Sequence, residues 1–148
     1  MKRILVAIDF SPVTEEQLKF VEDLIEPDGG DILLLHVLNP SPHYMGYGTM
    51  GDLVGLSESE LRAQLEALAD KMKLRLERDG VKVAVLLDHG EAIPRIIMEA
   101  ERTQADLLVL GSHGHGSLYD LLVGSTSEGV MRKTPCPVVL VPSPRNET

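Results

Sequence analysis

The stretch ADLLVLGSHGHGSLYDLLVGSTSEG, residues 105–129, decides the fold class. It opens with a short, almost continuously apolar run, which is typical of a strand buried on both faces of a parallel sheet. Residues 111–129 then contain five glycines, two histidines and the hydroxyl triplet Ser125-Thr126-Ser127. Ligands of open α/β sheets bind beyond the carboxyl ends of the strands, so this position predicts a binding loop.

Other short runs of Val, Ile and Leu predict the remaining strands, over residues 4–8, 31–37, 81–87 and 137–142, beside the run 105–111. The run 81–87 begins by alternating apolar and polar residues, which favours a more exposed edge strand. Helix-like stretches lie between the runs, the last of them between Gly124 and Pro135. The alternating order predicts an α/β fold with an open parallel sheet and helices on both faces.

Local signals fix the other helices. Ser11 is predicted to cap a helix that starts at Pro12. Ser57 and Glu60 form a capping box for a second helix, and Asp79-Gly80 is predicted to close it. The residues predicted to face the core are Leu18, Val21, Leu24 and Ile25, then Leu61, Leu65, Leu68, Met72 and Leu76, and, in a third helix over 91–103, Ile93, Ile96, Ile97 and Ala100.

Composition limits the function classes. A chain of 148 residues, with 43% apolar and 25% charged residues, is expected to form a single soluble domain over residues 1–148. The net charge of −9, without a basic cluster, argues against nucleic acid or an anionic membrane as partner. A lone cysteine, Cys136, is predicted to be a buried core residue and fits a reducing compartment. We therefore expect a cytoplasmic protein.

Known phosphate-binding and metal motifs do not match the glycine stretch. In GSHGHGS, Ser117 stands where a P-loop needs lysine, and no G-x-G-x-x-G follows the first strand. His113 and His115 have no neighbouring cysteine or carboxylate cluster, which argues against a dedicated metal site. Free backbone amides and a helix N-terminus at Gly124-Ser125-Thr126 could instead hold an anion.

The remaining pattern, Gly111-x2-Gly114-x9-Gly124-Ser125, resembles the ATP-binding signature G-x2-G-x9-G-[ST] of the universal stress proteins. The resemblance extends over nearly the whole chain. Its blocks are ILVAIDFS, LLHV, DHGEAIPRII, ADLLVLGSHG and LLVGSTSEGVMRKTPCPVVLVP. On these motifs the chain is identified as a member of that family.

The resemblance implies a Rossmann-like five-stranded parallel sheet in the order 3-2-1-4-5, with Asp9 and the Gly111 loop facing one crevice. It also implies ATP as ligand, with Mg²⁺ or Mn²⁺ held through the phosphates, and a homodimer formed through the last strand, Val138 to Val141. Asp9 would hold the ribose or adenine end, and Val37 would meet adenine through its backbone. The other implied contacts are Ala7 and Leu110 at the base, and Gly111, His113, Gly114, Gly124, Ser125 and Thr126 around ribose and phosphates.

Several positions leave alternatives open. Many relatives have Arg or Lys where this chain has His115-Gly116, so AMP or ADP remains an alternative to ATP. Asp9 is expected to contact the ligand, although it could instead bind only local amides. His36 is predicted to be a satisfied strand histidine, His89 a turn residue and His43 solvated. Residues 39–56 are either a flap or partner surface, or a loop without a role.

Two functions compete. The first is a nucleotide-dependent regulatory switch that acts on an unidentified protein partner in a stress response. The second is a slow ATP hydrolase or a self-phosphorylating enzyme, and a family member that has lost ATP is disfavoured because the signature is complete. Phosphoryl transfer needs a group that positions the nucleophile, and no catalytic residue can be assigned. Binding without fast turnover is therefore the preferred hypothesis.

Overall fold

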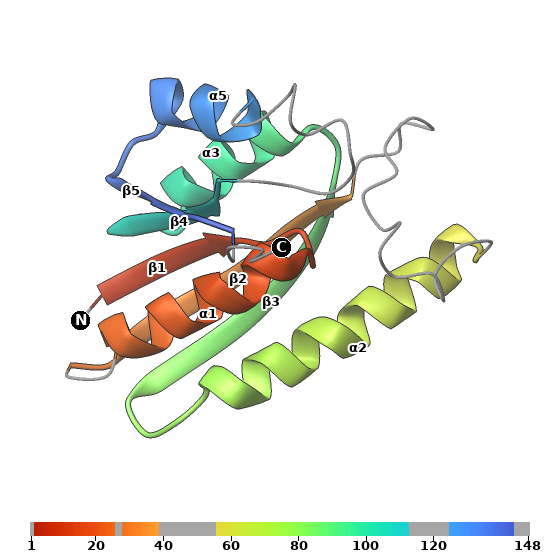
Figure 1. The fold of residues 1–148 in the computed structure, drawn as a ribbon, viewed down its shortest axis with the longest axis horizontal. Coiled ribbons are helices and arrows are strands. Elements are labelled where there is room, and N and C mark those ends of the chain that lie inside the picture. The colour runs from red at the N-terminus through yellow and green to blue at the C-terminus, as the bar shows by residue number, and fades with distance from the viewer. Residues whose placement is uncertain (1, 26–27, 39–55, 113–124, 144–148) are drawn as a thin grey trace, which may run out of the picture.

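The computed structural model describes residues 2–25, 28–38, 56–112 and 125–143, and all structural statements below concern these residues. Strands and helices alternate along the chain (Figure 1). The strands are β1 (Lys2–Ala7), β2 (Gly30–Leu38), β3 (Val81–His89), β4 (Leu107–Gly111) and β5 (Val138–Val141). The helices are α1 (Pro12–Ile25), α2 (Glu58–Leu76), α3 (Ala92–Arg102) and α5 (Ser125–Lys133).

The five strands form one parallel sheet in the order β3-β2-β1-β4-β5, which confirms the predicted fold class. In the central register, Leu5 of β1 pairs with Leu33 of β2 and with Leu108 of β4. As predicted, β3 is an edge strand whose residues alternate between buried and exposed at its start. The other edge is β5.

Helices cover both faces of the sheet (Figure 1). Because side chains alternate along a strand, each strand contributes to two cores. On one face α1 and α2 cover a core that includes Ile4, Val6, Leu34, Leu65 and Val109. On the other face α3 and α5 cover a core that includes Leu5, Leu35, Ile96, Leu108 and Val130, and half-buried Cys136 packs against it. The predicted core faces of the helices lie in these two clusters, either buried or half-buried.

The helix ends differ in part from the expectations. The capping box is confirmed, because Glu60 N–H donates to Ser57 Oγ at 3.2 Å and Ser57 N–H donates to Glu60 Oε1 at 3.3 Å. The predicted cap by the Ser11 side chain is wrong, since Ser11 Oγ is buried without a partner among the described residues. Gly80 does not close α2, which already ends at Leu76; it lies in the turn into β3 with φ +83°.

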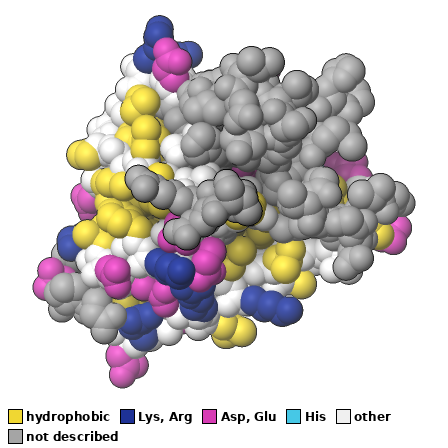
Figure 2. Space-filling view, viewed as in Figure 1, with side chains coloured by type: hydrophobic (Ala, Val, Ile, Leu, Met, Phe, Trp, Pro, Cys, Tyr) yellow, Lys and Arg dark blue, Asp and Glu magenta, His cyan; other side chains and the backbone are white. Residues whose placement is uncertain are grey.

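Ion pairs connect α1 and α2 on the surface. Arg75 of α2 contacts Glu15 at 2.6 Å and Glu22 at 2.7 Å, and Arg78 contacts Glu22 at 3.6 Å. Hydrogen bonds to Glu22 and Glu15 raise the pKa of Arg75 further above its usual value. Charged side chains gather in this part of the surface in Figure 2. This network fixes how α2 lies against α1.

Candidate functional site

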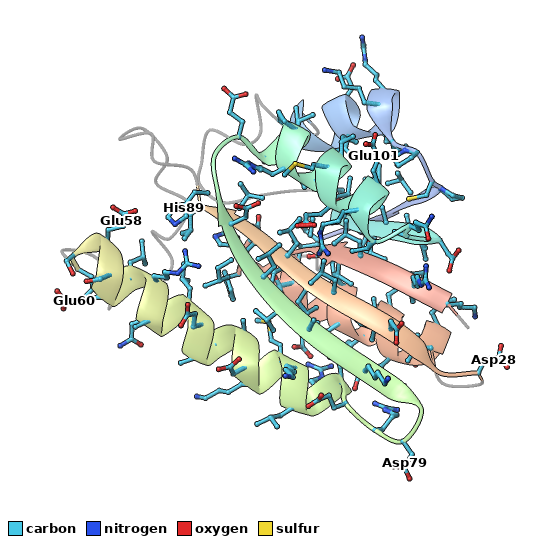
Figure 3. The ribbon with its side chains drawn as sticks, turned by 180° about the vertical axis from the view of Figure 1, so that it is seen from behind. Asp28, Glu58, Glu60, Asp79, His89 and Glu101 are labelled. Carbon is cyan, nitrogen blue, oxygen red and sulfur yellow. The ribbon has the colours of Figure 1, made fainter. Side chains whose placement is uncertain are left out.

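The chain order of the strands reverses between β1 and β4, and this reversal fixes the position of the candidate site. From β1 the chain passes over one face of the sheet through α1, while α3, which precedes β4, lies on the other face. The paired register of β1 and β4 ends at Val6 and Val109. Ligands of open α/β sheets bind beyond this point, and we refer to this position between the two carboxyl ends as the crevice. In Figure 3 the labels Glu58 and His89 mark the carboxyl edge of the sheet, where the strands end. The labels Asp28 and Asp79 mark the amino edge, where the strands begin.

Gln17 lies at the point where β1 and β4 separate. Its side-chain amide, only 1% exposed, donates to Ala7 O at 2.8 Å and to Val109 O at 3.4 Å. One helix residue thus donates to carbonyls of both strands at the base of the crevice. No sequence motif pointed to this residue. Its spacing of four from Val13 and from Val21, both buried, is the signal that places it on the inner face of α1.

Replacing Gln17 by leucine is expected to destabilise the protein by about 1–3 kcal/mol, because its hydrogen bonds to two buried carbonyls are lost. The matched control is Gln64→Leu on the exposed face of α2, for which we expect a change below about 0.5 kcal/mol. Urea denaturation followed by circular dichroism measures both free energies of unfolding. Equal stability of the two variants would contradict the assigned role.

Asp9 follows β1 at the lip of the crevice, and its carboxylate Oδ1 accepts a hydrogen bond from Ser11 N–H at 3.0 Å. This local contact is the one that the alternative interpretation of Asp9 required. Asp9 is half-buried and lies directly after the end of β1, beside the strand reversal.

The turn after Asp9 is held in an unusual conformation. Phe10 has φ +61°, a left-handed value that bulky residues rarely adopt. Its buried ring packs edge-on against His36, with ring centroids 4.9 Å apart and an interplanar angle of 70°. His36 Nδ1 lies 2.7 Å from Ile8 O, so that ring nitrogen donates to the carbonyl. His36 is therefore a satisfied core histidine, as predicted, and it anchors the turn that presents Asp9.

The end of β4 forms the other lip. Gly111 pairs in register with Val141 of β5, and Ser112 N–H donates to Val141 O at 2.9 Å. The Leu110 side chain is buried in the core beneath α3, together with Val37. Ala7 is half-buried against the same core. The structure therefore brings Ala7, Asp9, Leu110 and Gly111 to adjacent strand ends, with Val37 one strand further along.

Three predicted site residues, His113, Gly114 and Gly124, lie outside the described residues. So do most of the segment 39–56 and His43. Ser125 is the first residue of α5, and Thr126, in the same first turn, is exposed. His89 is the last residue of β3, which agrees with its predicted place at a strand end before Gly90, and its Nε2 lies 2.8 Å from Arg62 Nη1.

Three hydroxyls near the crevice are buried and have no hydrogen-bond partner among the described residues: Ser11, Thr14 and Ser112. Ser11 and Thr14 lie at the N-terminus of α1, and Ser112 directly follows β4. Buried polar groups without partners are uncommon because each costs free energy. Because these three hydroxyls lie together near the ends of β1 and β4, this edge of the sheet is polar although the core beside it is apolar.

Among the described residues, no group of three or more His, Cys, Asp or Glu side chains is arranged to hold a metal ion. No described helix has the length and apolar character that a bilayer crossing requires.

The fold is that of an open α/β protein, a class in which the strand reversal of the parallel sheet is the usual position of a ligand site. The chain belongs to the universal stress protein family, whose model matches residues 1–142. Its sequence is 32% identical over 152 residues to universal stress protein MJ0577 of Methanocaldococcus jannaschii, covering 95% of this chain and 94% of that protein.

Solved structures show the same fold. A structure of MJ0577 superposes with a TM-score of 0.74 at 30% identity and covers 98% of both chains. A universal stress protein from Archaeoglobus fulgidus in complex with dAMP gives a TM-score of 0.67 at 19% identity, covering 95% of this chain and 98% of that one. A universal stress protein in complex with cAMP gives 0.60 at 18% identity, covering 95% of each chain.

Proposed function

We propose that this protein binds ATP in the crevice between β1 and β4 and acts as a nucleotide-dependent regulatory protein in the cytoplasm. The observation that supports this most is the placement of Asp9 and Gly111 on adjacent strand ends at the strand reversal. The dAMP and cAMP complexes of two solved relatives indicate that this fold accommodates adenine nucleotides. Mg²⁺ or Mn²⁺ would enter with the phosphates.

The residues at the crevice fit a nucleotide. Ser112 Oγ, next to Gly111, is a buried hydroxyl without a partner among the described residues, which is the kind of group that a polar ligand atom satisfies. Gly111 has no side chain to obstruct a ligand that approaches the backbone. The N-terminus of α5, at Ser125 and Thr126, favours an anion. An acidic chain with a net charge of −9 can hold phosphates with such donors in place of lysines.

The proposed contacts fall into two groups, those to the nucleoside and those to the charged phosphates. Asp9 takes the nucleoside end, because its carboxylate would repel phosphates and accepts hydrogen bonds from ribose hydroxyls or an amino group. Ala7, Val37 and Leu110 belong to the strand ends nearest the base. Gly111, His113, Gly114, Gly124, Ser125 and Thr126 are assigned to ribose and phosphates on the signature.

Substitution of Asp9 tests the nucleoside contact. Asp9→Ala is expected to lower the affinity for ATP at least about tenfold, or 1.4 kcal/mol, measured by titration calorimetry. Asp9→Asn keeps an oxygen acceptor for Ser11 N–H and so separates the turn from the ligand contact. The matched control is Asp106→Ala, because Asp106 Oδ2 accepts from Arg3 N–H at 2.8 Å at the opposite edge. Unchanged ATP affinity in a folded Asp9→Ala protein would remove Asp9 from the site.

We also propose a homodimer through β5, residues Val138–Val141. This strand is an edge of the sheet, and unprotected edges invite pairing with another chain. Hydrophobic side chains gather over β4 and β5 in Figure 2. Leu140 is 39% exposed and Met131 of the neighbouring α5 is 46% exposed. A two-fold antiparallel contact between two β5 strands would cover this surface.

Leu140→Lys is expected to shift the dimer towards monomer, because it places a charge on the covered surface. Leu140 is a better test than Val139 or Val141, which pack into the core beneath α1. Leu74→Lys on α2 is the matched control, since Leu74 is 73% exposed and far from β5. Sedimentation at roughly 50 μM protein reports the mass of each variant. A wild-type monomer at that concentration would overturn the dimer.

A further inference from the structure

A second hollow lies at the amino edge of the sheet, at the opposite ends of the strands from Asp9. Its volume is about 280 Å³, slightly below the usual range of small-molecule pockets. The residues that matter for its chemistry are Arg3, Asp31, Leu33, Ala84, Arg102 and Thr103. The proposed nucleotide site uses none of them.

The floor of the hollow is apolar. Leu33 and Ala84 are register partners on β2 and β3, and both point to the face of the sheet that α3 covers. α3 packs on β1 and β2 and ends at Arg102, and Ala84 stays exposed. A small side chain at position 84 therefore leaves room between the edge strand and the end of α3.

Opposite charges line the hollow without pairing. Arg3 and Asp31 are register partners on β1 and β2, and their positions place them on one face. No ion pair joins them. Arg3 Nη1 instead donates to Gln104 Oε1 at 3.2 Å, which leaves most of the guanidinium donors unused. The Asp31 carboxylate has no side-chain hydrogen bond among the described residues.

The opposite wall adds a second guanidinium. Arg102 contacts Glu99 through Nε, so both of its terminal nitrogens are left to donate. Thr103 Oγ1 donates to Glu99 O at 2.7 Å, and its lone pairs are left to accept. Two guanidinium groups, one of them paired with Glu99, and the Asp31 carboxylate thus surround an apolar floor.

We propose that this hollow binds a small α-amino acid with an apolar side chain. Asp31 would receive the ammonium group, and Arg3 and Arg102 would receive the carboxylate, which guanidinium groups bind with two parallel hydrogen bonds. The apolar side chain would lie on Leu33 and Ala84. Neither an anion nor a cation alone uses both kinds of charged group, so the arrangement selects a zwitterion.

The test uses L-leucine as probe on the full chain, followed by titration calorimetry. We expect saturable binding with a Kd of about 0.1–1 mM. Two analogues dissect the charges: 4-methylpentanoate lacks the ammonium group, and 3-methylbutylamine lacks the carboxylate. Each is expected to bind at least about tenfold more weakly than leucine. Equal binding of either analogue, or no saturation by leucine at about 10 mM, would overturn the proposal.

Variants locate the site. Asp31→Asn and Arg3→Gln are each expected to weaken leucine binding about tenfold, and Ala84→Leu is expected to abolish it by filling the hollow. The control is Asp88→Asn, at the carboxyl end of the same β3, which should bind leucine as the wild type does. Wild-type affinity in folded Asp31→Asn protein would contradict the assignment. If a variant does not fold, the comparison of leucine with its two analogues on the wild-type protein still tests the proposed site.

Discussion

Gly30→Ala is expected to destabilise the protein by about 3 kcal/mol or more, enough to threaten a domain of ordinary stability. Gly30 is the first residue of β2, with φ +152°. A Cβ atom there would lie 2.3 Å from Lys2 O of β1 and 2.9 Å from Ile25 Cδ1. The nearer atom belongs to the backbone of a paired strand and can move only if the sheet opens.

The matched control is Gly80→Ala. Gly80 also has a positive φ, +83°, but no atom lies within 4 Å of an added Cβ. Gly80→Ala should therefore lower the free energy of unfolding only by the cost of placing alanine at a positive φ, about 1–2 kcal/mol. Urea denaturation gives both free energies of unfolding. A Gly30→Ala protein at least as stable as the Gly80→Ala protein would contradict the predicted clash between the added Cβ and Lys2 O.

Gly124→Val is expected to abolish measurable ATP binding while the fold remains intact. Gly124 immediately precedes α5 and is the third glycine of the signature. If the phosphates approach the backbone there, a branched side chain would occupy their place. We expect the loss to exceed about 100-fold in affinity, or 2.7 kcal/mol, by titration calorimetry.

Gly116→Val serves as the control, because Gly116 belongs to the same glycine-rich stretch but not to the signature. It should retain ATP affinity within about threefold. Circular dichroism establishes that both variants fold. Wild-type affinity in a folded Gly124→Val protein would show that the phosphate assignment is wrong.

The sheet could be predicted because buried parallel strands have a distinctive sequence. Runs such as ILVAI and DILLLHV are short and nearly continuous in apolar residues, as is typical of strands buried on both faces. The strand ends were less predictable. β3 continues through Asp88 and His89, which are polar but still pair with Val37 and Leu38 of β2. Pairing with a neighbour, not hydrophobicity, decides where that strand ends.

The strand reversal between β1 and β4 was located correctly in the chain, but the side chains that support it were not. Gln17 looks like any surface glutamine until α1 is laid on the sheet, where its amide meets carbonyls of β1 and β4. Ser11 shows the reverse. Its residue type and position predict a capping side chain, yet Thr14 N–H donates to Ser11 O at 2.9 Å and the hydroxyl is left without a partner. Both outcomes depend on tertiary contacts that a local pattern does not contain.

The hollow at the amino edge could not be predicted from the sequence either. Arg3 and Asp31 lie 28 positions apart and become neighbours only through the register of β1 and β2. Arg3 instead donates to Gln104, in the connection from α3 to β4. Strand register, helix length and one side-chain contact together create this feature.

Equilibrium dialysis of the purified chain against ATP with Mg²⁺ measures nucleotide binding directly. We expect saturable binding of one nucleotide per chain, with a Kd between about 1 μM and 1 mM. Parallel cells with ADP and AMP establish which phosphate chain the crevice prefers. The absence of saturable binding of all three nucleotides up to about 5 mM would contradict the proposal that this protein is a nucleotide-binding member of its family.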